Sequence, residues 1–108
     1  MGRQVTSFGT DAVVNKTITT TYTANSGERI FANASGGAFT ITLPAAPNDG
    51  DTIQIIDVAG IFGTNNVTLG RNGLKIQNLA EDLVCNLNNA AITMIYSGAT
   101  FGWVFIGP

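Results

Sequence analysis

The sequence contains no histidine and a single cysteine, and these two shortages exclude several kinds of enzyme chemistry. Histidine is the commonest general base and metal ligand, so Ser-His and Cys-His nucleophile pairs cannot form. A zinc site would have to combine one thiol with carboxylates, which is an improbable ligand set. No phosphate-binding loop or dinucleotide fingerprint is present either. We therefore predict a protein that is not an enzyme, with no catalytic residues, no metal ligands and no cofactor.

Charge is also scarce, because charged residues make up 11% of the 108 residues, against about 25% in an ordinary soluble domain. The lysines and arginines stand singly and the net charge is −2, so binding to nucleic acid is not expected. No apolar run approaches the roughly 20 residues that cross a bilayer, so no membrane partner is expected. A small chain that is 44% hydrophobic should cover apolar surface with partners. This predicts an oligomer.

Cys85 and the N-terminus give no sign of export. Cys85 lies in an apolar stretch and is interpreted as a small buried side chain, not a disulfide partner. The first residues lack the apolar segment of a signal peptide. The protein is therefore expected to be made in the cytoplasm and to stay there until something carries it out.

Helical periodicity is nearly absent, and alternation of apolar and polar residues dominates. Leu79, Leu83 and Leu87 have a spacing that a helix could use, but the alternation of Leu83, Cys85 and Leu87 favours a strand. Asn72-Gly73 predicts a type I′ hairpin turn between strands at 67–69 and 74–77. The other expected strands cover residues 17–23, 29–32, 38–43, 52–58, 91–96 and 101–106.

Short strands separated by Gly, Asn, Asp and Pro turns indicate an all-β fold. We predict a compact antiparallel β-sandwich, jelly-roll-like fold or small barrel. Residues 1–24 are Thr-rich and weakly apolar, so they form either an extended N-terminal arm or the first strand. Residues 25–108 form the domain. An arm could attach to a neighbour by adding a strand to its sheet.

Carboxylates are the remaining candidates for chemistry. Asp49 and Asp51 could bind calcium, but they lack the spacing of an EF-hand loop, and turn formation explains them better. Glu81 and Asp82 are adjacent. Asp57 lies in an apolar strand and needs a partner, for which Arg71 or Lys75 is a candidate.

The aromatic residues are expected to pack in the core or at an interface, although exposed aromatic faces could bind sugars. This applies to Trp103, Tyr22, Tyr96 and Phe62. Ile41 and Phe105 are also assigned to the core, where an aspartate would be costly.

From about Tyr22 onward the order of features resembles modules of tailed-bacteriophage structural proteins, especially tail fibres and small capsid or tail accessory proteins. The similarity is carried by residues 37–44, 47–53, 57–68 and 71–73, and by Gly102-Trp103 at the end. It implies a non-enzymatic virion component, commonly homotrimeric, with no catalytic residues to transfer.

The sequence and this resemblance leave three candidate functions. The first is a virion surface subunit, either capsid decoration (cement) or a short appendage, that contacts other virion proteins through its own faces and N-terminal arm. No heptads or shaft repeats are present to extend it from the particle. The alternative is a tail-fibre tip that binds a bacterial glycan or protein through loops 60–66 or 97–100, which is favoured if the chain is a fragment. The third is a glycan-degrading enzyme with a carboxylate pair.

Overall fold

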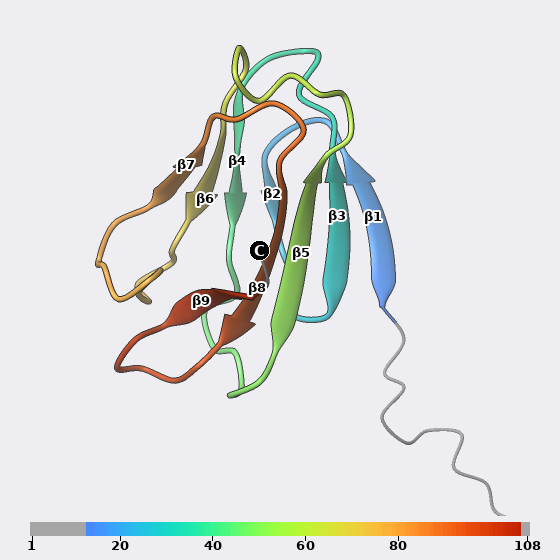
Figure 1. The fold of residues 1–108 in the computed structure, drawn as a ribbon. Helices are drawn as coiled ribbons and strands as arrows, with labels where there is room; N and C mark the ends of the chain where they lie inside the picture. The colour runs from blue at the N-terminus through green and yellow to red at the C-terminus, as the bar shows by residue number, and fades with distance from the viewer. Residues whose placement is uncertain (1–12, 107–108) are drawn as a thin grey trace, which may run out of the picture.

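The computed structural model describes residues 13–106, which form nine strands and no helix (Figure 1). Accordingly, no helix able to span a membrane occurs in this range. The strands are β1 (Val14–Ile18), β2 (Tyr22–Thr23), β3 (Glu28–Ala32), β4 (Phe39–Thr42), β5 (Thr52–Asp57), β6 (Val67–Gly70), β7 (Leu83–Cys85), β8 (Ala91–Tyr96) and β9 (Trp103–Ile106). The prediction of an all-β fold is confirmed.

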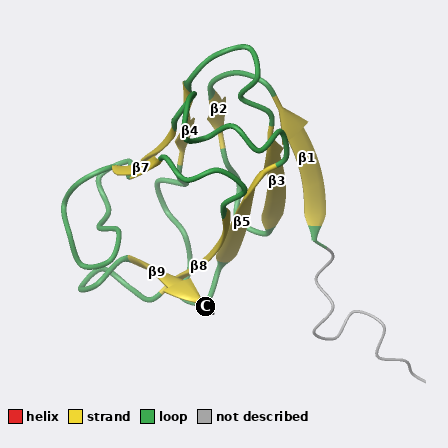
Figure 2. Ribbon diagram, turned by 45° about the horizontal axis from the view of Figure 1, so that its top comes forward, coloured by secondary structure: helices red, strands yellow, loops and turns green. Residues whose placement is uncertain are grey.

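The strands form two layered sheets, seen from a second direction in Figure 2. The five-stranded sheet has the order β1-β3-β5-β8-β9, and the four-stranded sheet has the order β2-β4-β6-β7. Burial alternates along β3, β4, β5 and β6, as two-residue periodicity requires when one face of each sheet is covered.

Most of the pairing is parallel, so the predicted antiparallel sandwich is wrong in this respect. The chain passes three times from the five-stranded sheet to the four-stranded one, as β1 to β2, β3 to β4 and β5 to β6. Successive coils stack in register, which makes β1-β3, β3-β5, β2-β4 and β4-β6 parallel. Each crossover to a parallel neighbour runs through the opposite sheet, a route that local alternation does not reveal. Each antiparallel pair of strands, β5-β8, β6-β7 and β8-β9, includes a strand that follows the third coil.

The predicted hairpin at Asn72-Gly73 is wrong, although its turn is present. Asn72 and Gly73 both have positive φ, 51° and 84°, and Leu74 N donates to Arg71 O at 3.1 Å. Residues 74–77 do not pair with β6, however. They lie beside Trp103 instead. The antiparallel partner of β6 is β7, which confirms the strand expected near Leu83 and Cys85. The last predicted pair, β8 with β9, is also confirmed.

The core lies between the two sheets. Its largest fully buried side chains include Trp103, Phe62, Ile30, Ile41, Leu43, Ile53, Ile55 and Met94. The core assignment is therefore confirmed for Ile41 and Trp103, and Cys85 is buried as expected. Phe105 was assigned to the core as well, but its side chain is 38% exposed. That prediction is wrong for a reason developed below.

The segment 1–24 falls partly outside the described residues, since residues 1–12 are not covered. Within the covered part, Val14–Ile18 forms β1 against β3, and Tyr22–Thr23 forms β2 against β4. The Thr-rich run expected as one strand at 17–23 is therefore divided between the two sheets.

Candidate subunit interface

An apolar groove lies at the end of the two sheets where β7, β8 and β9 meet. It has a volume of about 290 Å³. Its lining residues, here called the interface groove, are Leu83, Val84, Cys85, Asn86, Leu87, Ala90, Ala91, Ile92 and Phe105. None of these residues is charged near neutral pH, because burial raises the pKa of the Cys85 thiol to about 11. Leu87 is 72% exposed, and Val84 and Phe105 are also exposed.

The groove lies beside the end strands of the two sheets, β7 and β9. Phe105 lies opposite Met94 in the β8-β9 ladder, and Trp103 lies opposite Tyr96. Met94, Tyr96 and Trp103 are all buried, so Phe105 shares their inward-facing side of the sheet. β7, whose residues line the groove together with Phe105, has only three residues, and Phe105 stays 38% exposed. A large apolar side chain in this position indicates that a partner covers it.

The outer edge of β9 is already occupied. Trp103 N donates to Lys75 O at 2.9 Å, and Gln77 N donates to Trp103 O at 2.7 Å. The Gln77 side chain then accepts a hydrogen bond from Phe105 N through Oε1 at 3.0 Å. Covering an edge in this way prevents another strand from pairing there. Gly102 permits the close approach, since a Cβ at this position would lie 2.0 Å from Lys75 O.

The outer edge of β1 is different, because no strand in residues 13–106 pairs with it. Val14 N donates to Gly27 O at 3.1 Å, and Ile18 O accepts from Asn33 N at 2.9 Å. Alternate residues of a parallel strand bond the same neighbour, so Asn15 and Thr17 direct their backbone N–H and C=O groups outward. β1 is therefore an open edge of five residues.

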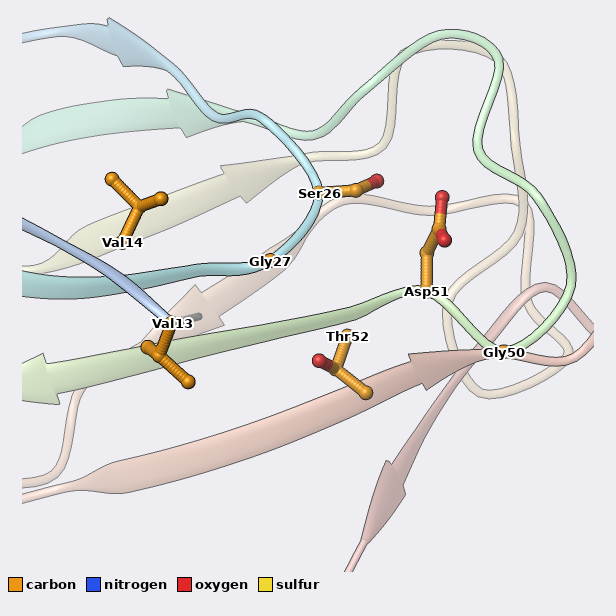
Figure 3. A pocket seen from close by; sticks show the side chains of 7 residues that line it. All are labelled: Val13, Val14, Ser26, Gly27, Gly50, Asp51 and Thr52. Atoms are coloured by element: carbon orange, nitrogen blue, oxygen red, sulfur yellow. The ribbon is translucent and has the colours of Figure 1, made fainter. Parts of the chain in front are cut away.

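Beside the start of β1 lies a cavity of about 280 Å³ (Figure 3). It is lined by Val13, Val14, Ser26, Gly27, Gly50, Asp51 and Thr52. Val13 and Val14 are about half exposed. Exposed apolar side chains thus lie on or beside both edge strands of the five-stranded sheet, β1 and β9.

Asp57 connects the loop that follows β5 to the loop that precedes β8. Its carboxylate is buried and accepts hydrogen bonds from the backbone N–H groups of Ile61 at 3.0 Å, Phe62 at 2.9 Å and Asn89 at 2.9 Å. Burial raises the pKa of Asp57, but these backbone hydrogen bonds outweigh it and leave the pKa below its usual value. Neither Arg71 nor Lys75 is a partner of this carboxylate, so that prediction is wrong.

A second buried carboxylate, that of Glu28, connects β2 to β3. Glu28 accepts hydrogen bonds from Tyr22 Oη at 2.7 Å and from Asn25 N at 2.9 Å. Burial, followed by the hydrogen bond to Glu28, raises the pKa of Tyr22 to about 12. Sequence reasoning did not identify Glu28, because nothing in its local pattern distinguishes it from an exposed residue at a strand start.

Two further carboxylates, those of Asp51 and Asp82, accept hydrogen bonds from backbone N–H groups in loops. Asp51 Oδ2 accepts from Asn48 N at 2.8 Å, and Asp82 Oδ1 accepts from Arg71 N at 2.9 Å. In residues 13–106 no three Cys, Asp or Glu side chains gather as metal ligands would.

The predicted aromatic packing is confirmed for three of the four residues. Trp103, Phe62 and Tyr96 are buried, and the Tyr96 and Trp103 rings have centroids 5.3 Å apart. Tyr22 is half-buried. Loops 60–66 and 97–100 lie at opposite ends of the β5-β8 pair, since Ile56 pairs with Ala91 and Thr52 with Ile95. They do not form one surface.

No protein-family model matches the chain. A stretch of 49 residues is 47% identical to the long-tail fiber proximal subunit of Enterobacteria phage T4. The match covers 44% of this chain and 4% of that protein, so the chain spans a small fraction of its relative. Over this stretch the chain is similar to a tail-fibre protein of a tailed phage. This confirms the resemblance found in the sequence, and it assigns the chain to the phage virion.

Proposed function

We propose that this chain is a non-enzymatic structural subunit of a tailed-phage particle that self-associates, as a homotrimer, through the interface groove. The observation that carries the proposal is the inward-facing, exposed Phe105 beside Leu87 and Val84. Apolar side chains on an uncovered core face are typical of a surface that is buried in an assembly.

The site on the particle is proposed to be the tail, as a short appendage or part of a fibre, in preference to capsid decoration. The similarity to a tail-fibre subunit supports this choice. Contacts with other virion proteins would use faces of the domain that the groove leaves free, together with the segment that precedes β1.

A second candidate function is a tail-fibre tip that binds a bacterial surface glycan or protein. One observation favours it. Leu79 and Phe101 are both more than half exposed beside loop 97–100, and Asn78 N donates to Phe101 O at 3.0 Å. These side chains lie at the loop and not in the interface groove.

Light scattering on the purified chain near neutral pH separates the two candidates when it is combined with a cell-binding assay. The structural-subunit proposal predicts a mass three times the 11.2 kDa of one chain and no retention on whole bacteria. A monomer that sediments with cells, and loses this property on Phe101→Ala, would support the tip function instead.

A further inference from the structure

Within residues 13–106, β1 lies at one end of the two sheets, and β7 and β9 lie at the other (Figure 1). The interface groove is at the β7 and β9 end, and the open edge of β1 is at the other. A closed ring with an odd number of identical subunits joins two different patches at every contact, because a self-complementary patch produces two-fold pairs. A trimer of this chain therefore needs two distinct surfaces on each copy.

We infer that β1 of one copy adds to the edge of β7 in a second copy, with Val14 packed against the interface groove. This inference rests on the proposed self-association and specifies the two surfaces that meet. The partner of each β1 edge is a second copy of this chain.

The edges of the sheets support this pairing. Of the two strands that end the sheets beside the groove, β9 is covered by Lys75 and Gln77, so it accepts no further strand. β7 pairs with β6 on one side, and within residues 13–106 no strand pairs with its other side. β1 offers the outward N–H and C=O groups of Asn15 and Thr17. Joining the two edges satisfies backbone groups of both strands.

Apolar surface and charge are also complementary. Val14 and the groove residues Val84 and Leu87 are exposed in the single chain and become buried together in the pair. Lys16 is the charged residue of β1, and Glu81 and Asp82 immediately precede β7. Opposite charges therefore accompany the two strands that are inferred to pair.

Thr17→Pro tests the β1 edge directly. Proline removes the outward N–H of Thr17 and leaves intact the hydrogen bonds that Val14 and Ile18 make to the β3 side, so the domain should remain folded. Thr17→Ala is the matched control, because it removes the side chain and keeps the N–H. We expect Thr17→Pro to raise the concentration for half-assembly roughly tenfold or more, and Thr17→Ala to assemble like the unsubstituted chain. Circular dichroism checks the fold of both.

Mixing two defective variants tests whether the contact joins different patches. Leu87→Asp damages the groove and keeps β1, whereas Thr17→Pro damages β1 and keeps the groove. Native mass spectrometry of the mixture should show a one-to-one heterodimer that neither variant forms alone. Homodimers of Thr17→Pro would instead demonstrate groove-to-groove contact and overturn the inference.

A charge exchange provides a test that does not depend on proline. Lys16→Glu should weaken assembly, and combining it with Glu81→Lys should restore it. If the unsubstituted chain is monomeric, the proposed function fails as well. If it assembles but Thr17→Pro and Lys16→Glu have no effect, this inference alone is overturned.

Discussion

Replacing Asp57 with asparagine should destabilise the domain by about 3 kcal/mol. The carboxylate accepts three backbone hydrogen bonds, one at Oδ1 and two at Oδ2. Asparagine keeps one acceptor oxygen, so the best orientation preserves the bonds from Phe62 and Asn89 in weaker, neutral form. Its amide group then faces the N–H of Ile61, and that bond is lost. Hydrogen bonds to charged groups contribute about 1.5–3 kcal/mol each, against about 1 for neutral ones.

Urea unfolding followed by Trp103 fluorescence measures this loss at a fixed protein concentration, since assembly also affects apparent stability. A loss of about 3 kcal/mol corresponds to a decrease in Tm of about 12–24 °C for a domain of this size. Asp49→Asn is the matched control, because the same chemical change occurs at an exposed turn residue. It should change stability by less than about 0.5 kcal/mol.

The effect of Asp57→Asn should depend on pH. The pKa of Asp57 is lowered in the folded chain, so its carboxylate contributes stability above the unfolded pKa of about 3.9. That contribution is lost as pH falls through the folded pKa. The difference between the two proteins should therefore be constant near pH 7 and diminish in acid. Equal stability of Asp57→Asn and Asp49→Asn at pH 7 would refute this account of the loops.

Three further predictions concern the core, a tyrosine and the cysteine. Ile41→Ala should cost about 2–5 kcal/mol in urea unfolding of the isolated domain, whereas Phe105→Ala should cost less there because Phe105 is partly exposed; equal losses would contradict the placement of Phe105. Ultraviolet titration should show Tyr22 ionising near pH 12, and its contribution to stability should be complete below pH 10 and lost as pH rises from about 10 to about 12. Tyr22→Phe should abolish that dependence. Burial raises the pKa of Cys85 to about 11, so a thiol reagent at pH 8 should label it only after unfolding; rapid labelling of the folded chain would show that the thiol is accessible.

Much of the fold can be predicted from the sequence because two-residue alternation depends on local burial. The strands at Phe39–Thr42, Thr52–Asp57 and Ala91–Tyr96 all follow it. The order of the strands cannot be predicted in this way. β3 and β5 are parallel neighbours although a complete passage through the other sheet separates them, and alternation is the same for parallel and antiparallel strands when one face is covered.

The sequence predicts that the chain has a surface covered by a partner, but it does not predict where on the fold this surface lies. Low charge and high apolar content predict a covered surface, yet Phe105 is assigned to the core because it is a large apolar residue in an apolar strand. Its exposure depends on where the opposite sheet ends, which is a tertiary feature. The partner of Asp57 was missed for a related reason, since Ile61, Phe62 and Asn89 supply backbone N–H groups that any residue could supply.

The most direct test of self-association through the interface groove is the solution mass of Leu87→Asp beside that of Leu79→Asp. Both changes replace an exposed leucine with an aspartate, but only Leu87 lines the interface groove. Light scattering should find Leu87→Asp as a monomer of 11.2 kDa, and Leu79→Asp with a mass three times larger. Two variants of equal mass, whether both monomeric or both assembled, would contradict the proposed role of the groove.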